Sequence, residues 1–230
     1  MTDTLYESMG APRDKARQSE QVNGLLTAIV SNSKDPQKLG RIKVKFLARE
    51  EENESDWAPV ASLIGGKQRG AFFLPEVGDE VLVAFLNGNV DYPVIIGTLW
   101  STEDKPPEQN ADGKNNIKLY KSRAGHTVTF SDDSQGKKAK IEIKSSSGNT
   151  ITLDDASGKE KVEIKDKTGK NKITMDATKK SIEIAGDMQI NIKAKTINIE
   201  GETALNLKSK VLKIESSGIV EIKGNTVKIN

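Results

Sequence analysis

Pairs of apolar residues with one residue between them recur along the second half of the chain. Thirteen such pairs occur between Ile117 and Ile229, as in INIKAKTINIEG (190–201). The pairs are widely and unevenly spaced up to Ile182, and from there they begin at positions 182, 190, 197, 205, 212, 220 and 227. Residues i and i+2 share one face of a strand but lie about 200° apart on a helix. The pattern therefore predicts short strands joined by tight turns.

Each predicted strand buries only two aliphatic side chains. Their burial contributes about 3 to 6 kcal/mol, whereas ordering seven or eight residues costs about 1 to 2 kcal/mol for each residue. The strands must therefore stack and share a core. Two arrangements satisfy this need: a single-chain β-solenoid with three strands in each turn, or three chains that wind together around a triangular core.

The chain end bears on this choice. The apolar pattern runs to the last residues, NTVKIN, so a single-chain solenoid would expose an uncapped apolar end, which promotes aggregation. Thirteen strands spaced about 4.8 Å apart would make a trimeric rod about 60 Å long. This comparison favours the intertwined homotrimer, with its blunt end available to a separate cap protein.

Alternating segments before residue 101 predict a small β domain. The candidate strands are GRIKVKF (40–46), WAPVASL (57–63), GAFFLP (70–75), the segment after the turn at Gly78-Asp79, and YPVIIGTLW (92–100). Asn87-Gly88 is a hairpin signal. Several short strands without helical periodicity suggest a barrel such as the OB-fold, a five-stranded Greek-key barrel.

The chain is thus expected to be all-β, with four parts: a polar N-terminal segment (1–21), an OB-fold barrel (22–100), a linker (101–116) and a β-helical needle (117–230). Composition supports the division, since no aromatic residue follows Phe130, no arginine follows Arg123 and no proline follows Pro107. Beyond Phe130 the needle core is therefore expected to be narrow and aliphatic.

Net charge and cysteine content exclude several classes of protein. The formal net charge is only +2, and residues 140–230 hold 17 Lys against 13 Asp and Glu, so no nucleic-acid partner is predicted. Cysteine is absent, so disulfides and thiolate metal sites are excluded. The N-terminal residues lack the apolar core of a signal peptide, and no apolar run approaches a membrane span. A protein made in the cytoplasm is expected.

The candidate chemical groups favour structural roles. His126 is the only histidine and is expected to be a polar residue at a strand edge. Asp132-Asp133 and Asp154-Asp155 lie in predicted turns, where solvated corners are more common than calcium ligands. The lysines from Lys137 onward alternate with acidic residues and are expected on a solvated face. No catalytic, cofactor-binding or metal-binding residue is predicted, and the protein is not expected to be an enzyme.

Aromatic residues of the barrel bear on nucleic-acid binding, because OB-folds bind oligonucleotides through exposed rings. Phe72, Phe73 and Phe85 lie in apolar runs and are expected in the core, whereas Trp57 and Trp100 are expected to be partly exposed. The loop from Gly65-Gly66 through KQRG (67–70) is expected to be a turn or a partner contact.

The two halves together resemble a known family. FLPEVGDEVLVAFLNGNVDYPVIIGTLW (73–100) is similar to the closing part of the OB-fold in phage baseplate assembly protein V and in the VgrG spikes of type VI secretion. The linker and repeated tail are similar to that family's trimeric β-helical needle. The resemblance covers residues 20 to 230 and implies a homotrimeric spike at the centre of a contractile-tail baseplate, which punctures the target envelope when the sheath contracts.

This chain differs from the family in three ways, and the differences change the partners that are expected for it. No hub-like domain precedes the barrel, so a separate baseplate hub protein is expected. The linker is too short for a lysozyme-like domain. His126 lies near the start of the needle, so the histidine-rich, iron-binding tip of short phage spikes is absent, and a PAAR-like tip protein is expected at the C-terminal end. The resemblance also implies possible effector cargo and transient contact with the target membrane.

Two other classes of function remain as alternatives. A single-chain β-solenoid could bind carbohydrate, although such a groove needs aromatic residues or clustered carboxylates. An OB-fold nucleic-acid binder would show salt-dependent binding.

Overall fold

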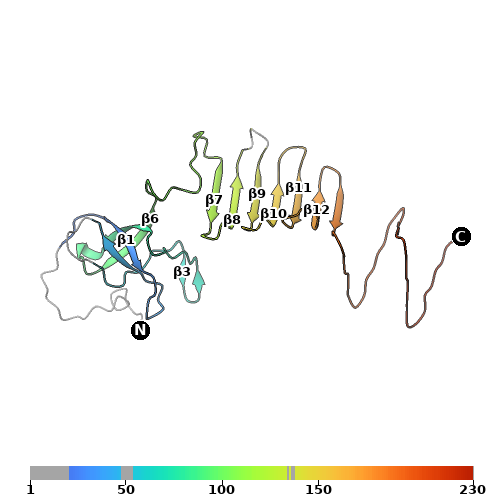
Figure 1. The fold of residues 1–230 in the computed structure, drawn as a ribbon, viewed down its shortest axis with the longest axis horizontal. Coiled ribbons are helices and arrows are strands. Elements are labelled where there is room, and N and C mark those ends of the chain that lie inside the picture. Colours follow the sequence, from blue (N-terminus) through green and yellow to red (C-terminus); the bar gives the residue numbers. More distant parts are fainter. Residues whose placement is uncertain (1–20, 48–53, 134, 136–137, 230) are drawn as a thin grey trace.

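The computed structural model describes residues 21–47, 54–133, 135 and 138–229. The predicted N-terminal segment, apart from Gln21, and Lys137 therefore lie outside the described residues. Figure 1 shows three parts in chain order: a barrel, a long sheet whose strands stand side by side, and an extended tail that turns back and forth. None of the helices in the described ranges is long and apolar enough to cross a membrane.

The barrel is built on one antiparallel sheet with the strand order β2-β1-β5-β6. Its strands are β1 (Leu26–Asn32), β2 (Lys43–Phe46), β5 (Glu80–Phe85) and β6 (Pro93–Leu99). The short helix η1 (Leu86–Gly88) turns β5 into β6 at the predicted Asn87-Gly88 corner. Gly78, with φ 102°, makes the predicted turn before β5.

The segment 58–61 closes the barrel. Ile42 and Ala58 exchange backbone hydrogen bonds of 2.8 and 3.0 Å, while Ile95 donates to Pro59 and accepts from Ala61. This segment thus joins the two edge strands, β2 and β6, through isolated bridges rather than as the continuous strand predicted for 57–63. Alternate residues of the strands fill the interior, and each is at most 8% exposed: Ala28, Val30, Ile42, Val44, Phe46, Ala58, Val81, Val83 and Ile95.

The segment GAFFLP (70–75) does not form the predicted strand. Only the two-residue strands β3 (Gly65–Gly66) and β4 (Arg69–Gly70) pair there, and the chain beyond Gly70 runs without a ladder partner. Phe72 and Phe73 are 78% and 72% exposed. The prediction that these two rings lie in the core is wrong, because without a strand nothing directs them inward.

A buried ion pair fixes the loop between β1 and β2. Asp35 accepts hydrogen bonds from Arg41 through Nε (3.0 Å) and Nη2 (2.8 Å), and both side chains are 3% exposed. Backbone amides of Gln37 and Leu39 also donate to its carboxylate. The Arg41 guanidinium, aided by these amides, holds the pKa of Asp35 well below its ordinary value.

We expect Asp35→Asn to destabilise the barrel by about 3 to 5 kcal/mol, because it removes the charged acceptor of two hydrogen bonds from the buried Arg41 guanidinium. Urea unfolding followed by the fluorescence of Trp57 and Trp100 measures this loss, since both tryptophans lie in the barrel. Glu54→Gln is the control: its ion pair with Lys43 is partly exposed, so the loss should be about 1 kcal/mol or less. Equal losses in the two variants would contradict the account.

The same ion pair predicts a pH dependence. The folded-state pKa of Asp35 lies below its ordinary value of 3.8. Its stabilisation is therefore complete well above pH 3.8 and declines as the pH falls through that value. The difference in stability between the parent and Asp35→Asn should narrow between pH 5 and pH 3, in unfolding curves at each pH.

The second sheet is a seven-stranded antiparallel meander in which every strand pairs with the next one in sequence. Its strands are β7 (Ile117–Lys121), β8 (Thr127–Ser131), β9 (Lys140–Lys144), β10 (Thr150–Asp154), β11 (Lys161–Lys165), β12 (Lys172–Asp176) and β13 (Ser181–Ala185). A single-chain solenoid would instead pair strands in parallel, three apart along the chain. The solenoid alternative is therefore wrong for residues 117–185.

The tail differs from the sheet. Over the described residues 186–229, no strand and no ladder partner occurs within the chain. The change falls where the step between apolar pairs shortens, at Ile182. Two of the six corners of the tail, Ala194-Lys195 and Ser209-Lys210, lack the Gly, Asn or Asp that two-residue hairpins require, so an antiparallel return is disfavoured at these two. Glycine lies in each of the other four corners.

Together these parts confirm the predicted all-β fold class.

Candidate assembly surface

One face of the seven-stranded sheet is apolar from β8 to β13, and on β7 it carries Lys118 beside Tyr120. The register aligns two rows of side chains on it. The first row is Phe130, Ile141, Leu153, Val162, Met175 and Ile182. The second row is Tyr120, Val128, Ile143, Ile151, Ile164, Ile173 and Ile184. At the centre of the sheet Ile164 is 45% exposed and Leu153 is 40% exposed, so the described part of the chain leaves this face largely uncovered.

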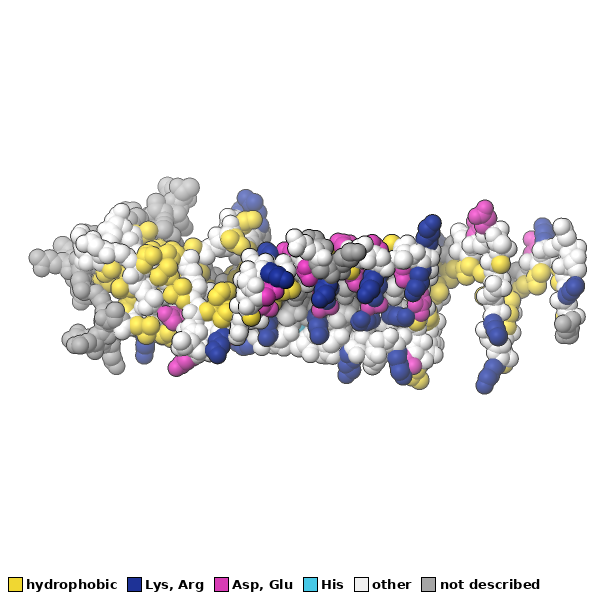
Figure 2. Space-filling view, turned by 90° about the horizontal axis from the view of Figure 1, so that it is seen from above, with side chains coloured by type: hydrophobic (Ala, Val, Ile, Leu, Met, Phe, Trp, Pro, Cys, Tyr) yellow, Lys and Arg dark blue, Asp and Glu magenta, His cyan; other side chains and the backbone are white. Residues whose placement is uncertain are grey.

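The opposite face is polar and carries a central row in which Thr and Glu alternate. Its members are Thr129, Glu142, Thr152, Glu163, Thr174 and Glu183. Lys165 and Lys161 bind Glu163 at 2.7 and 3.3 Å, and the hydrogen bond from Lys165 is the largest cause that lowers the pKa of this carboxyl. Figure 2 shows basic and acidic side chains interspersed along the sheet. Such a face suits solvent, so the apolar face is the one that needs a partner.

The first strand departs from the pattern. Ile117 and Leu119 pair with Ser131 and Thr129, which places them on the polar face. Tyr120, which the pattern of apolar pairs omits, takes the apolar side opposite Val128. The prediction that Ile117 and Leu119 begin the apolar face is therefore wrong.

Apolar positions of the tail are even more exposed. The twelve residues of its six pairs range from 47% exposed at Ile197 to 91% at Ile229. Figure 2 shows successive passes of this tail separated by open gaps, with hydrophobic side chains along them. A chain of this kind has neither a core nor backbone partners of its own, and unpaired backbone groups and exposed apolar side chains are both costly.

A repeated corner joins the hairpins along one edge of the sheet. In each corner a glycine with positive φ donates its N–H to the residue three positions earlier: Gly125 to Ser122, Gly148 to Ser145 and Gly169 to Asp166. A side chain just beyond each glycine then accepts a backbone N–H from the next corner. These contacts are His126 with Ser146 (3.2 Å), Asn149 with Lys167 (3.0 Å) and Asn171 with Asp187 (2.9 Å).

His126 thus occupies the place that Asn149 and Asn171 take in later corners. We expect His126→Asn to preserve the stability of the sheet within about 0.5 kcal/mol, since an amide oxygen supplies the same acceptor, whereas His126→Ala should cost about 0.5 to 1.5 kcal/mol through the lost hydrogen bond. Thermal unfolding followed by circular dichroism compares the two variants. If the Asn variant is as damaged as the Ala variant, His126 has another role.

The acidic pairs lie in hydrogen-bonded corners. Asp132 accepts from Lys118 Nζ at 2.9 Å, and Asp154 accepts from the Ala156 amide at 3.0 Å. Within the described ranges, no group of three or more His, Asp or Glu side chains is placed to hold a metal ion.

Aromatic residues of the barrel divide between core and surface. Phe85 packs against the core with its ring 5.7 Å from that of Phe46. Trp100 is 70% exposed, and half-buried Trp57 lies 5.7 Å from Lys43 Nζ.

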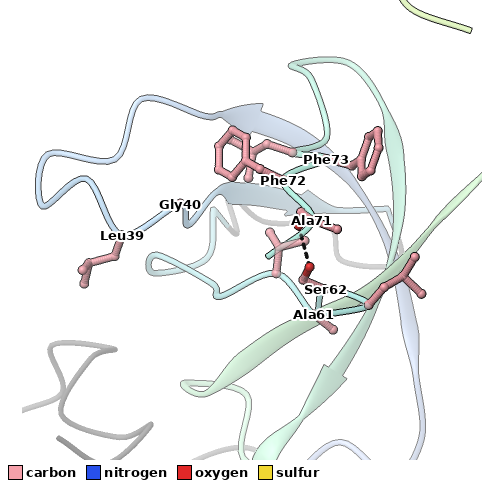
Figure 3. Close-up of a pocket in the computed structure, with 10 residues that line it drawn as sticks. Leu39, Gly40, Ala61, Ser62, Ala71, Phe72 and Phe73 are labelled. Carbon is pink, nitrogen blue, oxygen red and sulfur yellow. Dashed lines mark hydrogen bonds between the residues drawn. The ribbon is translucent and has the colours of Figure 1, made fainter. Parts of the chain in front are cut away.

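Phe72 and Phe73 border a hollow of about 290 Å³ on the barrel surface, above the hydrogen bond from Ser62 Oγ to the Ala71 carbonyl (Figure 3). The rest of its lining includes Leu39, Gly40 and Leu63. An apolar surface on the barrel, which sequence reasoning assigned to the core, thus adds to the apolar face of the sheet.

Residues 26–100 match the family of type VI secretion system/phage-baseplate injector OB domains. The barrel is therefore similar to an injector-type OB domain, and the resemblance inferred from the sequence is confirmed over residues 26–100.

Three relatives show how far the similarity extends. The type VI secretion system spike protein VgrG5 of Pseudomonas aeruginosa is 42% identical over 79 residues, which are 33% of this chain and 10% of the relative. Spike protein VgrG1a of the same species is 32% identical over 122 residues, 48% of this chain and 19% of the relative. The actin cross-linking toxin VgrG1 of Vibrio cholerae is 36% identical over 72 residues, 30% of this chain and 7% of the toxin. The matched part thus spans less than a fifth of each relative.

Proposed function

We propose that this chain is the structural central spike of a contractile-tail or injection-system baseplate, and that three copies form its needle. The observation that carries the proposal is the tail, where twelve apolar positions are exposed and the described backbone from 186 to 229 forms no ladder within the chain. The injector OB domain and the names of the relatives support a secretion or phage-tail particle as the setting of such a needle.

The sheet and the tail would contribute to the trimeric needle in different ways. Each sheet presents an apolar face two rows wide, and three such faces would close a triangular prism with a dry core. In the tail, three consecutive segments, such as those that begin at Ile190, Ile197 and Leu205, would make one turn around the same axis. The gaps between passes in Figure 2 would then receive the strands of the two other chains, which would supply the missing backbone hydrogen bonds.

The role of this needle is mechanical. Stacked hydrogen bonds and a dry aliphatic core give dense β assemblies high resistance to unfolding, which suits a rod that punctures a cell envelope. The barrel (22–100) would join a separate hub protein, with the polar segment (1–21) beside it, and the linker (101–116) would lead to the needle (117–230). A PAAR-like protein at the C-terminal end, effector cargo and transient membrane contact complete the proposed partners.

We propose no enzymatic activity, cofactor or nucleic-acid partner. Two of the three relatives are named spike proteins, and the match to the toxin covers 7% of its length. Phe73 stacks on Tyr120 of the same chain at 5.9 Å, so one face of its ring is already occupied.

Electron microscopy of the purified chain tests the proposal. The expected particle is a straight rod with three barrels at one end and three-fold symmetry in end views. Compact particles of single chains, or irregular aggregates, would contradict it. A gel-shift titration with single-stranded DNA tests the alternative that the OB-fold binds nucleic acid. Binding at low salt that weakens as salt is added would favour that alternative over the spike.

A further inference from the structure

The barrel contacts the sheet through one aromatic pair and one ion pair. Phe73 stacks on Tyr120 with the rings 17° from parallel, and Arg123 binds Glu76. These contacts hold the loop before β5 against the first hairpin of the sheet. Tyr120 belongs to the apolar face, so Phe73 stands over the barrel end of that face.

Beneath Phe73 lies an apolar hollow of about 460 Å³. Its walls are Phe73, Tyr120, Val128 and Ile143, with His126 and Thr127 at the side of the corner hairpins. Tyr120, Val128 and Ile143 are consecutive members of the second row, on β7, β8 and β9. The hollow is therefore centred on β8 and opens on the face that the proposed trimer buries.

One residue of the first row is unlike all the others. Phe130, also on β8, carries an aromatic ring and is 37% exposed, whereas no later member of that row is aromatic. Phe130 is also the last aromatic residue of the chain. The bulkiest side chain of the first row thus lies on the same strand as the centre of the hollow in the second row.

Three-fold symmetry brings these two features together. In a closed ring of three identical sheets, the first-row edge of each sheet meets the second-row edge of the next. The symmetry also holds each strand at the same height as its copies, so β8 of one chain faces β8 of its neighbour. On the basis of the trimer proposed above, we infer that Phe130 of each chain inserts into the Phe73–Tyr120–Val128–Ile143 hollow of the neighbouring chain.

This contact would fix the axial register of the three chains. The corner repeat recurs at Gly125, Gly148 and Gly169, so a slip by two strands would still pair one apolar row with another. Registers are weakly specified where the pattern repeats in this way. A ring and a matching hollow that occur once, at the barrel end, distinguish the correct alignment from the slipped ones.

Photo-crosslinking in the full-length chain tests the inference. The photoreactive analogue p-benzoylphenylalanine replaces Phe130, and after illumination a denaturing gel separates crosslinks between chains from those within one chain. We expect bands at two and three times the 25.0 kDa chain, and peptide mapping should place the crosslinks near Phe73, Tyr120 or Ile143. The same analogue at Leu47, an exposed barrel residue, is the control and should give no such bands.

The mass of the same preparation, measured by light scattering, tests the trimer independently of the inserted Phe130 ring. If the particle is trimeric and Phe130 crosslinks only within its own chain, or to another segment of the neighbour, the inserted ring is wrong and the proposed spike stands. If the particle is monomeric, both are wrong.

Discussion

Replacing Ile164 by aspartate should prevent assembly of the needle. Ile164 lies in the second row on β11, at the middle of the apolar face. In the trimer the substitution would place three carboxylates in a dry core, at an effective cost of several kcal/mol for each one, besides the lost burial of three isoleucines at about 1.5 to 3 kcal/mol each. The sum, more than about 10 kcal/mol, is comparable with the whole stability of a domain.

The expected result for Ile164→Asp is a loss of the trimeric species in size-exclusion chromatography, with increased binding of a hydrophobic dye. Ala185→Asp is the matched control, because it adds the same carboxylate on the polar face, opposite Lys172. That variant should remain assembled with a stability change within about 1 kcal/mol. If Ile164→Asp assembles as well as the control, the apolar face is not the buried one.

Removing the tail should convert a kinetically resistant particle into one that dissociates readily. A chain that ends at Ala185 keeps all seven strands of the sheet but loses the segment that we propose winds around two other chains. Intertwined chains separate only when their strands unwind, so their dissociation is governed by a slow unfolding step. The full chain is expected to migrate as a trimer in unheated SDS, and the truncated chain as a monomer.

A shorter truncation gives the control for this comparison. A chain that ends at Gly224 loses only the last apolar pair, Val227 and Ile229, and should retain most of the resistance to SDS. Resistance that is unchanged in the chain ending at Ala185 would show that the tail adds no interchain pairing. A gradual loss as successive pairs are removed would agree with winding along the tail.

Side-chain periodicity was sufficient to predict most of the local structure. The i, i+2 pairs from Val128 to Ile184 all lie on β-strands and on one face. Successive side chains of a pleated strand point to opposite faces, so residues i and i+2 must share one. The alternation of Val81 and Val83 similarly placed them in the barrel core.

Errors arose where tertiary contacts decide which face or partner a residue takes. Ile117 and Leu119 follow the same pattern as later pairs, yet the pairing of β7 with β8 turns them to the polar face and presents Tyr120 instead. Phe72 and Phe73 follow a small residue in an apolar run, but their segment has no ladder partner and Phe73 docks on the sheet. The corner role of His126 became visible only when the hairpins were aligned, since the equivalent Asn149 lies two strands further along the chain.

The number of residues between successive apolar pairs falls at Ile182, and this change marks where the sheet ends and the tail begins. The wider steps before Ile182 leave room for a hairpin turn after each strand, and the chain pairs with itself there. The shorter steps beyond it leave less chain between successive apolar pairs, and the described chain is extended there. One sequence pattern thus covers two arrangements, and the length of chain between strands separates them.

The solution mass of the full-length chain tests the central claim most directly. Light scattering on a size-exclusion column measures it independently of shape. The account predicts three times the 25.0 kDa mass of one chain, with strong β-sheet circular dichroism. A folded particle with the mass of a single chain would contradict the trimeric needle, and with it the proposed spike.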